Sequence, residues 1–242
     1  MLFVKCCNRG KVQTLRYGLL LLGFIVLVTG HANASDEFQF RINSTLAVEM
    51  AKKWKGTAGI ESRYDESGHQ VKNHADLGVV YTGIAQWFDI GLNYRTIFRR
   101  LQTDLEQDQW LRENRMYLNF LMRHRIKETG FNHRIRLEYS TTDRIDDFGT
   151  IRYRVAINPP VEYDPSNERL ILRNYTIRPY GSYELAVNTT DYHTGSHSFK
   201  AGLSAQFSNR IYGNFYYLRE QNHTKQDNYG VNVVGIDLKL LF

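Results

Sequence analysis

The stretch Tyr229–Phe242 reads Y-G-V-N-V-V-G-I-D-L-K-L-L-F and decides the fold class. Counted back from the terminus, its apolar residues fall at every second position, and Asp237 and Lys239 lie between them. A period of two is that of a β-strand with one apolar face. In water such a terminal strand would promote aggregation, whereas in lipid it can close a barrel. Its apolar face consists of Val234, Ile236, Leu238, Leu240 and Phe242.

This segment resembles the closing strand of bacterial outer-membrane barrels, which ends in an aromatic residue read by the barrel-assembly machinery. On that resemblance, the five apolar residues ending at Phe242 are the expected assembly signal. The alternation breaks farther back, because Val231 and Val233 are out of phase with Val234 and Ile236. We therefore expect a β-bulge at 233–235, which would turn both halves of the strand toward lipid.

The beginning of the chain predicts export. Residues 1–34 combine a basic segment, a ten-residue apolar core at Leu19–Val28 and small residues at Ala32 and Ala34. This order is typical of a signal peptide cleaved after Ala34. The alternative, an uncleaved anchor, is disfavoured because a spanning helix needs about 20 apolar residues. Residues 35–242 would then form one domain in the bacterial outer membrane.

Removal of the signal changes the composition. The full chain has 31 Lys and Arg against 25 Asp and Glu, and the mature part keeps 27 basic residues and a net charge of +2. The basic excess is thus mostly a property of the signal and does not indicate a nucleic-acid partner. Both cysteines, Cys6 and Cys7, also leave with it, which excludes disulfides and thiol chemistry from the mature protein.

The middle of the chain repeats one kind of segment. From Phe38 onward, segments of about ten residues are apolar at every second position and are separated by polar turns, as in transmembrane β-barrels. Eleven such segments are visible, but single-chain bacterial barrels normally have an even number of strands. We expect a single antiparallel barrel of ten to twelve strands, with twelve favoured by division of 168–187 at Pro179-Tyr180-Gly181. Residues 101–114 are expected to form a loop.

The polar face of these segments would line the lumen, and it is rich in arginine. R-x-R pairs occur at 123/125, 134/136 and 152/154 on three consecutive segments. Adjacent strands lie about 4.8 Å apart, so the six guanidinium groups are expected to form one continuous basic track. The candidate lumen residues are Arg95, Arg115, Arg123, Arg125, Arg134, Arg136, Arg152, Arg154 and Arg178, together with Glu138 and Glu184.

Two functions fit this lumen. In one, the basic excess lines a small pore or binding barrel for small anionic solutes. In the other, arginines and carboxylates pair across a closed barrel, which has a structural or cell-envelope role without conduction. Outer-membrane lipid, lipopolysaccharide and the assembly machinery are the expected partners in both.

The enzymatic signals are weaker. The best is H-T-G-S-H at 193–197 with Glu184 or Asp191 nearby, which has the residue types of a lipid-modifying hydrolase. Loops are rich in such residues, so no catalytic residue is assigned. The sequence has no zinc-ligand spacing, phosphate-binding glycine loop or nucleotide motif, and we expect no metal and no cofactor.

Four short motifs carry a family resemblance. They are K-W-K at 53–55, E-N-R-M-Y at 113–117, N-H-R-I-R-L-E-Y at 132–139 and I-R-Y-R-V at 151–155. Together they resemble the bacterial family called domain of unknown function 2490. That resemblance implies an exported outer-membrane barrel and brings no assigned activity.

Overall fold

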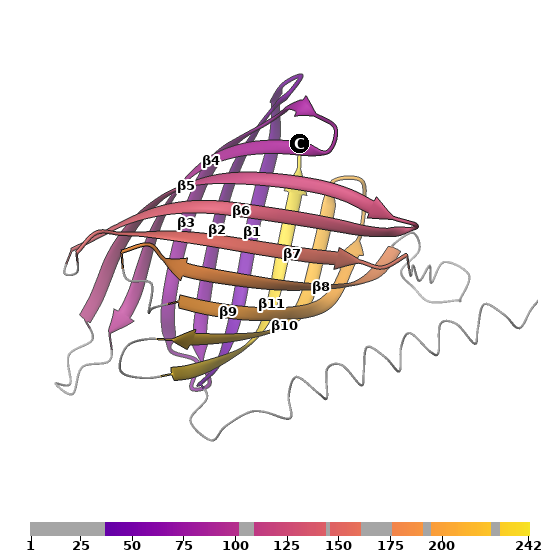
Figure 1. The fold of residues 1–242 in the computed structure, drawn as a ribbon. Helices are drawn as coiled ribbons and strands as arrows, with labels where there is room; N and C mark the ends of the chain where they lie inside the picture. The colour runs from indigo at the N-terminus through magenta and orange to yellow at the C-terminus, as the bar shows by residue number, and fades with distance from the viewer. Residues whose placement is uncertain (1–36, 102–108, 144–145, 161–175, 191–194, 224–227) are drawn as a thin grey trace, which may run out of the picture. The chain divides into compact units, whose positions relative to one another are not determined.

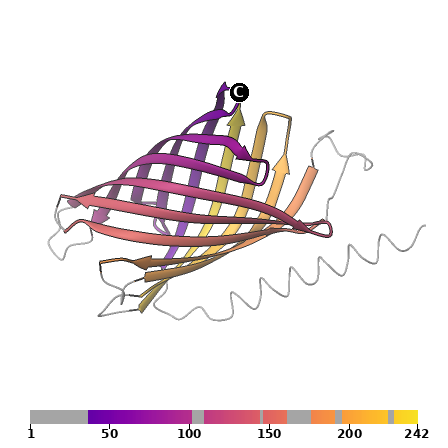
Figure 2. The ribbon, with the colours of Figure 1, turned by 45° about the horizontal axis from the view of Figure 1, so that its top comes forward.

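The computed structural model describes residues 37–242 apart from 102–108, 144–145, 161–175, 191–194 and 224–227. The predicted signal peptide at 1–34 and its cleavage site lie outside the described residues. The described part forms eleven strands that close into a barrel in chain order (Figures 1 and 2). No helix within these ranges is long and apolar enough to cross a membrane. The strands are β1 (Glu37–Ala51), β2 (Trp54–Asp65), β3 (Gln70–Ala85), β4 (Phe88–Leu101), β5 (Gln109–Ile126), β6 (Thr129–Thr142), β7 (Phe148–Asn158), β8 (Thr176–Asn188), β9 (Gly195–Gln206), β10 (Ile211–His223) and β11 (Asn228–Leu241).

The barrel closes through a parallel pair. Every other neighbouring pair is antiparallel, but β1 and β11 run in the same direction, from Glu37 opposite Val231 to Ala47 opposite Leu241. An odd number of alternating strands necessarily gives the first and the last the same direction. The all-β barrel is thus confirmed, whereas the expected even count of ten or twelve and the wholly antiparallel sheet are wrong.

The expected extra strand does not form because Pro179-Tyr180-Gly181 continues β8 instead of turning. These three residues lie opposite Leu203, Gly202 and Ala201 of β9. On the other side, β7 pairs with β8 only as far as Ile157 opposite Gly181. Pro179, which lacks an N–H, therefore lies where β8 has only one pairing neighbour, a position that a strand tolerates. Residues 168–175 of the proposed division lie outside the described residues.

The expected loop at 101–114 is also partly wrong. Gln109 begins β5, and its first residues pair with the end of β4, where Leu101 lies opposite Gln109 and Arg99 opposite Leu111. Residues 102–108 lie outside the described residues. The start of β5 is rich in polar residues, as loops are, because some of its side chains face the lumen. Its backbone nevertheless pairs with β4 as a strand.

Four short turns lie at one rim of the barrel. Two-residue turns at 52–53, 86–87 and 127–128 and the turn at 207–210 all join an odd-numbered strand to the next strand. Phe242 lies at the same rim, where its backbone N–H donates to the Ala47 carbonyl over 2.9 Å. β1 starts at the opposite rim, because Gln39 lies opposite Asp65 at the end of β2.

The outer face is apolar, as the alternation predicts. Large apolar side chains remain exposed on every strand, for example Ile60 at 66% and Ile42 at 52%. On β11, the outward residues include Ile236, Leu238 and Leu240, each about two-fifths exposed, while Asp237 borders the lumen. A surface of this kind is stable in lipid and prone to aggregation in water.

The expected β-bulge in β11 is absent. β10 and β11 pair without a register shift from Ile211 opposite Leu240 to His223 opposite Asn228. Val231 and Val233 instead keep the inward phase and pack in a buried cluster with Tyr216 and Leu218. The two valines need no lipid face because apolar partners inside the barrel already bury them.

Tyr216 organises this inner cluster. It lies opposite glycine on both neighbours, Gly202 of β9 and Gly235 of β11. A Cβ added to Gly235 would lie 2.3 Å from the tyrosine ring, and one added to Gly202 would lie 2.7 Å from its Cβ. The glycines thus make room for an aromatic side chain that covers both strands.

Candidate functional site in the lumen

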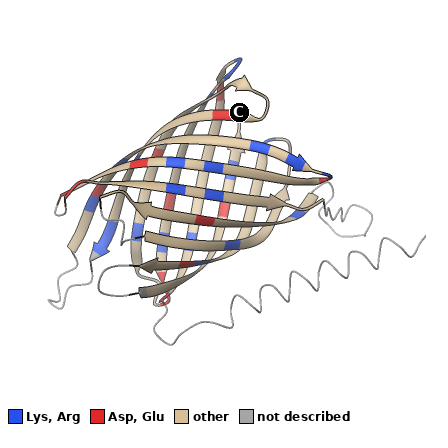
Figure 3. Cartoon of the chain, viewed as in Figure 1, with Lys and Arg blue, Asp and Glu red and all other residues tan. Residues whose placement is uncertain are grey.

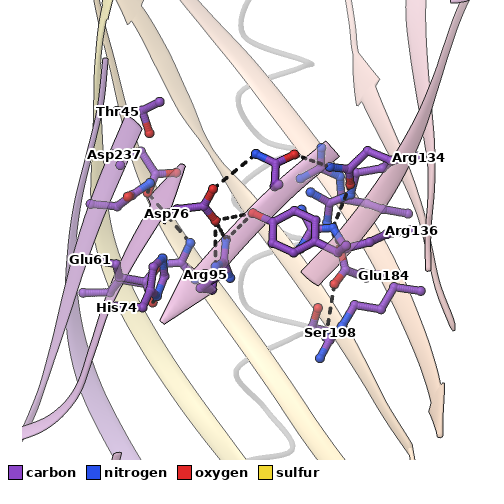
Figure 4. Close-up of a pocket in the computed structure, with 18 of the residues that line it drawn as sticks. Thr45, Glu61, His74, Asp76, Arg95, Arg134, Arg136, Glu184, Ser198 and Asp237 are labelled. Atoms are coloured by element: carbon purple, nitrogen blue, oxygen red, sulfur yellow. Dashed lines mark hydrogen bonds and ion pairs between the residues drawn. The ribbon is translucent and has the colours of Figure 1, made fainter. Parts of the chain in front are cut away.

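The lumen holds a cavity of about 740 Å³ lined by residues from all eleven strands. Figure 4 shows charged side chains that project into this space from opposite walls. Among the described lining residues, twelve are Lys or Arg and six are Asp or Glu. The basic ones are Arg41, Arg63, Lys72, Arg95, Arg99, Arg115, Arg134, Arg136, Arg152, Arg154, Lys200 and Lys239, and the acidic ones are Glu61, Asp76, Glu138, Glu184, Glu220 and Asp237.

Glu138 of β6 is the centre of the arginine-rich side. Its carboxylate accepts hydrogen bonds from Arg115 over 2.9 Å, from Arg152 over 2.9 Å and from Arg136 over 3.2 Å. The side chain of Glu138 is almost wholly buried. Three charge-assisted hydrogen bonds hold this carboxylate in a place where an unpaired charge would be costly.

Glu184 of β8 is the second anchor on this side. It accepts a hydrogen bond from Arg134 over 2.5 Å and a longer one from Arg152 over 3.4 Å. Arg152 therefore bridges Glu138 and Glu184 and links three successive strands. The result is a connected network in which each carboxylate contacts more than one guanidinium.

A tyrosine connects this network to the next part of the wall. The Tyr117 hydroxyl donates to Asp76, which also accepts from Arg95 over 2.7 Å. The guanidinium carbon of Arg136 lies 4.2 Å from the centre of the Tyr117 ring, and that of Arg95 lies 5.2 Å away. Both guanidinium groups are close enough to the ring for cation–π attraction, so Tyr117 contacts cations from two clusters.

The opposite wall has its own charge cluster. Glu61 forms ion pairs of 2.8 Å with Arg41 and 2.9 Å with Arg63, and both partners come from β1 and β2. Nearby, Asp237 of β11 accepts a hydrogen bond from Lys200 over 2.8 Å. Every cation named here has a carboxylate within ion-pair distance, so this wall is locally compensated.

Arg154 differs from these residues. Within the ranges that the structure describes, its side chain makes no hydrogen bond or ion pair, and its Nε is buried without a partner. It lies on the lumen face of β7 directly opposite Arg134 of β6. On its other side Arg154 lies opposite Glu184 of β8, whose ion pairs go to Arg134 and Arg152, so the Arg154 guanidinium has a carboxylate nearby but no direct ion pair.

The expected track of three R-x-R pairs is only partly formed. Arg134 and Arg136 lie opposite Arg154 and Arg152, and bands of basic residues run side by side on β6 and β7 (Figure 3). Arg123, however, lies opposite Asn132, and Arg125 opposite Gly130. The β5 pair is displaced along the barrel because alternation fixes the face of a residue and not the register of its strand.

The remaining candidates divide by position. Arg95 and Arg115 line the cavity. Arg123 pairs with Asp89 over 2.6 Å, and almost half of its side chain is exposed. Arg125 and Arg178 are exposed and do not line the cavity.

Sequence reasoning did not select several residues that complete the lumen. Arg41, Arg63 and Lys200 all hold ion pairs there, and Tyr117 joins two clusters. The signal that would have found them is the inward phase of their strands, which does not depend on an R-x-R motif.

The hydrolase candidate is split by the fold. Ser196 lines the cavity, whereas the neighbouring His197 points to the other face of β9, where its ring stacks on His223. Glu184 is held by Arg134 and Arg152. Asp191 and His193 lie outside the described residues. Among the described residues, no group of three or more His, Cys, Asp or Glu side chains is arranged to hold a metal ion.

The comparison with known families confirms the one expected from the motifs. Residues 35–230 match the model described as Protein of unknown function (DUF2490), and the chain belongs to this family. No curated protein matches the sequence.

Three solved structures are similar in fold at low identity. LpxR from Salmonella typhimurium aligns with a TM-score of 0.49 and 7% identity over 82% of this chain and 87% of that chain. The anion-selective porin from Comamonas acidovorans aligns with a TM-score of 0.35 and 11% identity over 78% of this chain and 53% of that chain. The β-domain of the Bordetella autotransporter BrkA aligns with a TM-score of 0.38 and 12% identity over 79% of this chain and 82% of that chain. No ligand or activity is carried over from them.

Proposed function

We propose that this protein is an outer-membrane barrel whose lumen binds small anionic solutes and lets them pass. The observation that carries the proposal is the cavity of about 740 Å³, which twelve basic and six acidic residues line within the described ranges. Fixed guanidinium groups attract anions, and the low dielectric of a narrow lumen strengthens this attraction.

The membrane location rests on the outer surface. The barrel leaves no free sheet edge, and its exterior carries apolar side chains on every strand. Such a surface fits lipid and, at one rim, lipopolysaccharide. The apolar residues of β11 up to Phe242 remain the expected signal for the barrel-assembly machinery.

A closed, salt-bridged barrel without conduction is the second candidate. It is favoured by the multiple pairing of Glu138 and Glu61 and by the buried cluster around Tyr216 and Val233. Such pairing fills part of the lumen and holds neighbouring strands together. The two candidates differ in one measurable property, the passage of ions.

Planar-bilayer conductance of the refolded protein separates them. We expect discrete current steps and a reversal potential that shows anion selectivity. Selectivity should fall when Arg134, Arg136, Arg152 and Arg154 are together changed to Gln. Arg210→Gln is the matched control, because Arg210 is exposed in the β9–β10 turn. Absence of any current in the wild type would refute passage and leave the closed barrel.

The hydrolase alternative has an independent test. It requires lipase activity in the wild-type protein that is lost in both His193→Ala and Ser196→Ala. An inactive wild type would end it without affecting the conductance result.

A further inference from the structure

The wall formed by β6 and β7 contains two directly opposed arginine pairs. Arg134 lies opposite Arg154, and Arg136 lies opposite Arg152. Like charges at directly opposite positions destabilise neighbouring strands. Their presence on the lumen face therefore calls for compensating negative charge.

The protein supplies only part of that charge. In the described residues around this wall, five guanidinium groups from Arg115, Arg134, Arg136, Arg152 and Arg154 contact or face three carboxylates, Glu113, Glu138 and Glu184. The local balance is +2. Glu184 lies opposite Arg154 across β7 and β8, but its ion pairs go to Arg134 and Arg152.

Unused hydrogen-bond donors mark where a ligand would lie. The Nε groups of Arg134 and Arg154 are both buried without a hydrogen-bond partner. The hydroxyl of Tyr180, on neighbouring β8, is a third such group inside the barrel. Buried donors are almost always satisfied, because an unpaired one retains its full desolvation cost. Two such donors on opposed guanidinium groups are where an anion would find partners that the described side chains do not supply.

We propose that Arg134 and Arg154 form a binding subsite for the phosphate group of a small solute. A phosphate dianion presents several acceptor oxygens to two guanidinium forks and neutralises more of the local +2 than a carboxylate does. The site lies in the cavity of about 740 Å³, which leaves room for the rest of a small molecule. The proposal rests on the proposed function in one respect, that anionic solutes reach the lumen.

Titration calorimetry of the refolded protein in detergent tests the subsite. The probes are inorganic phosphate, glucose 6-phosphate and acetate. We expect saturable heat with the two phosphates and little with acetate. Loss of a charge-assisted hydrogen bond weakens binding by about tenfold or more, so Arg134→Gln and Arg154→Gln should each do so. Arg210→Gln should bind as the wild type does.

The two phosphate probes identify the source of the ligand. Binding of both supports a site for the phosphate group of an esterified solute. Binding of inorganic phosphate alone supports the site but assigns it to the free ion. Equal affinity for acetate, or unchanged phosphate affinity in Arg154→Gln, would overturn the proposal.

Misfolding does not obscure this test. Arg154 has no ion pair to lose within the described residues, so its Gln variant should fold, which a comparison of its urea unfolding with that of the wild type checks. Arg154→Lys keeps the charge without the fork, and intermediate affinity is expected. Conductance is measured separately: an anion-selective pore without phosphate binding refutes only the subsite, whereas phosphate binding without current refutes only passage.

Discussion

Two arginine pairs in the lumen share one geometry and differ in their surroundings. Arg41 lies opposite Arg63 across β1 and β2, and Arg134 lies opposite Arg154 across β6 and β7. In the first pair, Glu61 precedes Arg63 by two residues on the same face and contacts both guanidinium groups. In the second, the positions two residues from Arg154 are Arg152 and Ala156, and Glu184 on β8 pairs with Arg134 and Arg152 but not with Arg154. A carboxylate shared by both arginines thus separates a structural clamp from a candidate anion site.

The largest expected effect comes from breaking the compensated pair. Glu61→Gln leaves Arg41 and Arg63 facing each other in a buried position without their shared anion. Loss of one partner of a buried ion pair costs about 3–5 kcal/mol, so the free energy of unfolding in urea should fall by that amount. Glu49→Gln is the control, because Glu49 is exposed and its ion-pair partner in the described part of the chain is the exposed Lys55. Similar unfolding midpoints for both variants would contradict the clamp.

Removing one arginine from each pair compares them directly. Arg41→Gln deletes an ion pair of 2.8 Å with a buried carboxylate, so unfolding should become easier by about 1.5–3 kcal/mol. Arg154→Gln deletes a cation without a direct ion pair that lies between Arg134 and Glu184, so the opposing effects should leave stability within about 0.5 kcal/mol of the wild type. The measurement is again urea unfolding in phosphate-free buffer. Equal losses in the two variants would show that Arg154 has a hidden partner.

A new carboxylate should make the Arg134–Arg154 pair resemble the compensated Arg41–Arg63 pair. Ala156 lies two residues after Arg154 on the same face of β7, so Ala156→Glu places a carboxylate beside the unpaired guanidinium. Phosphate affinity should fall about tenfold, because an internal anion competes for Arg154. Calorimetry measures the change, and Ala156→Gln controls for side-chain size. If the Glu and Gln variants bind phosphate equally, charge at this site does not govern affinity.

Added salt should give the smallest effect, and it should weaken anion selectivity from the Arg134–Arg154 wall more than the stability that Glu61 gives to Arg41 and Arg63. Raising KCl from about 0.1 to 1 M shortens the Debye length from about 10 to 3 Å. Anion selectivity from the uncompensated wall should decrease, while the stability that Glu61 provides should change by less than about 1 kcal/mol. Reversal potentials and urea unfolding at the two concentrations check this. A loss of stability as large as that in Glu61→Gln would contradict the buried pairing.

Much of the fold follows from the alternation of single strands. The period of two predicts which residues face lipid, and it places Arg134, Arg136, Arg152 and Arg154 in the lumen. It does not predict register, which depends on turn geometry and on packing between strands, and the displacement of Arg123 and Arg125 reflects this. Val233 shows the same limit, because its inward position depends on contact with Tyr216 and Leu218.

The pairing within the lumen could not be predicted for a related reason. R-x-R motifs mark strands with inward arginines, but the partner of each guanidinium is set by neighbours far away in sequence. Arg115 binds Glu138 of the next strand, and Lys200 binds Asp237 two strands away. The distinction between compensated and uncompensated arginines therefore requires three-dimensional contacts.

The odd strand count also determines what a probe at each end of the barrel reports. β1 begins at the rim opposite the one where β11 ends (Figure 1). In a membrane, a cysteine introduced at Glu37 and one introduced at Phe242 would be labelled from opposite sides. A pair of impermeant reagents applied to vesicles would then read the insertion direction directly, and an even-stranded barrel could not provide that internal reference.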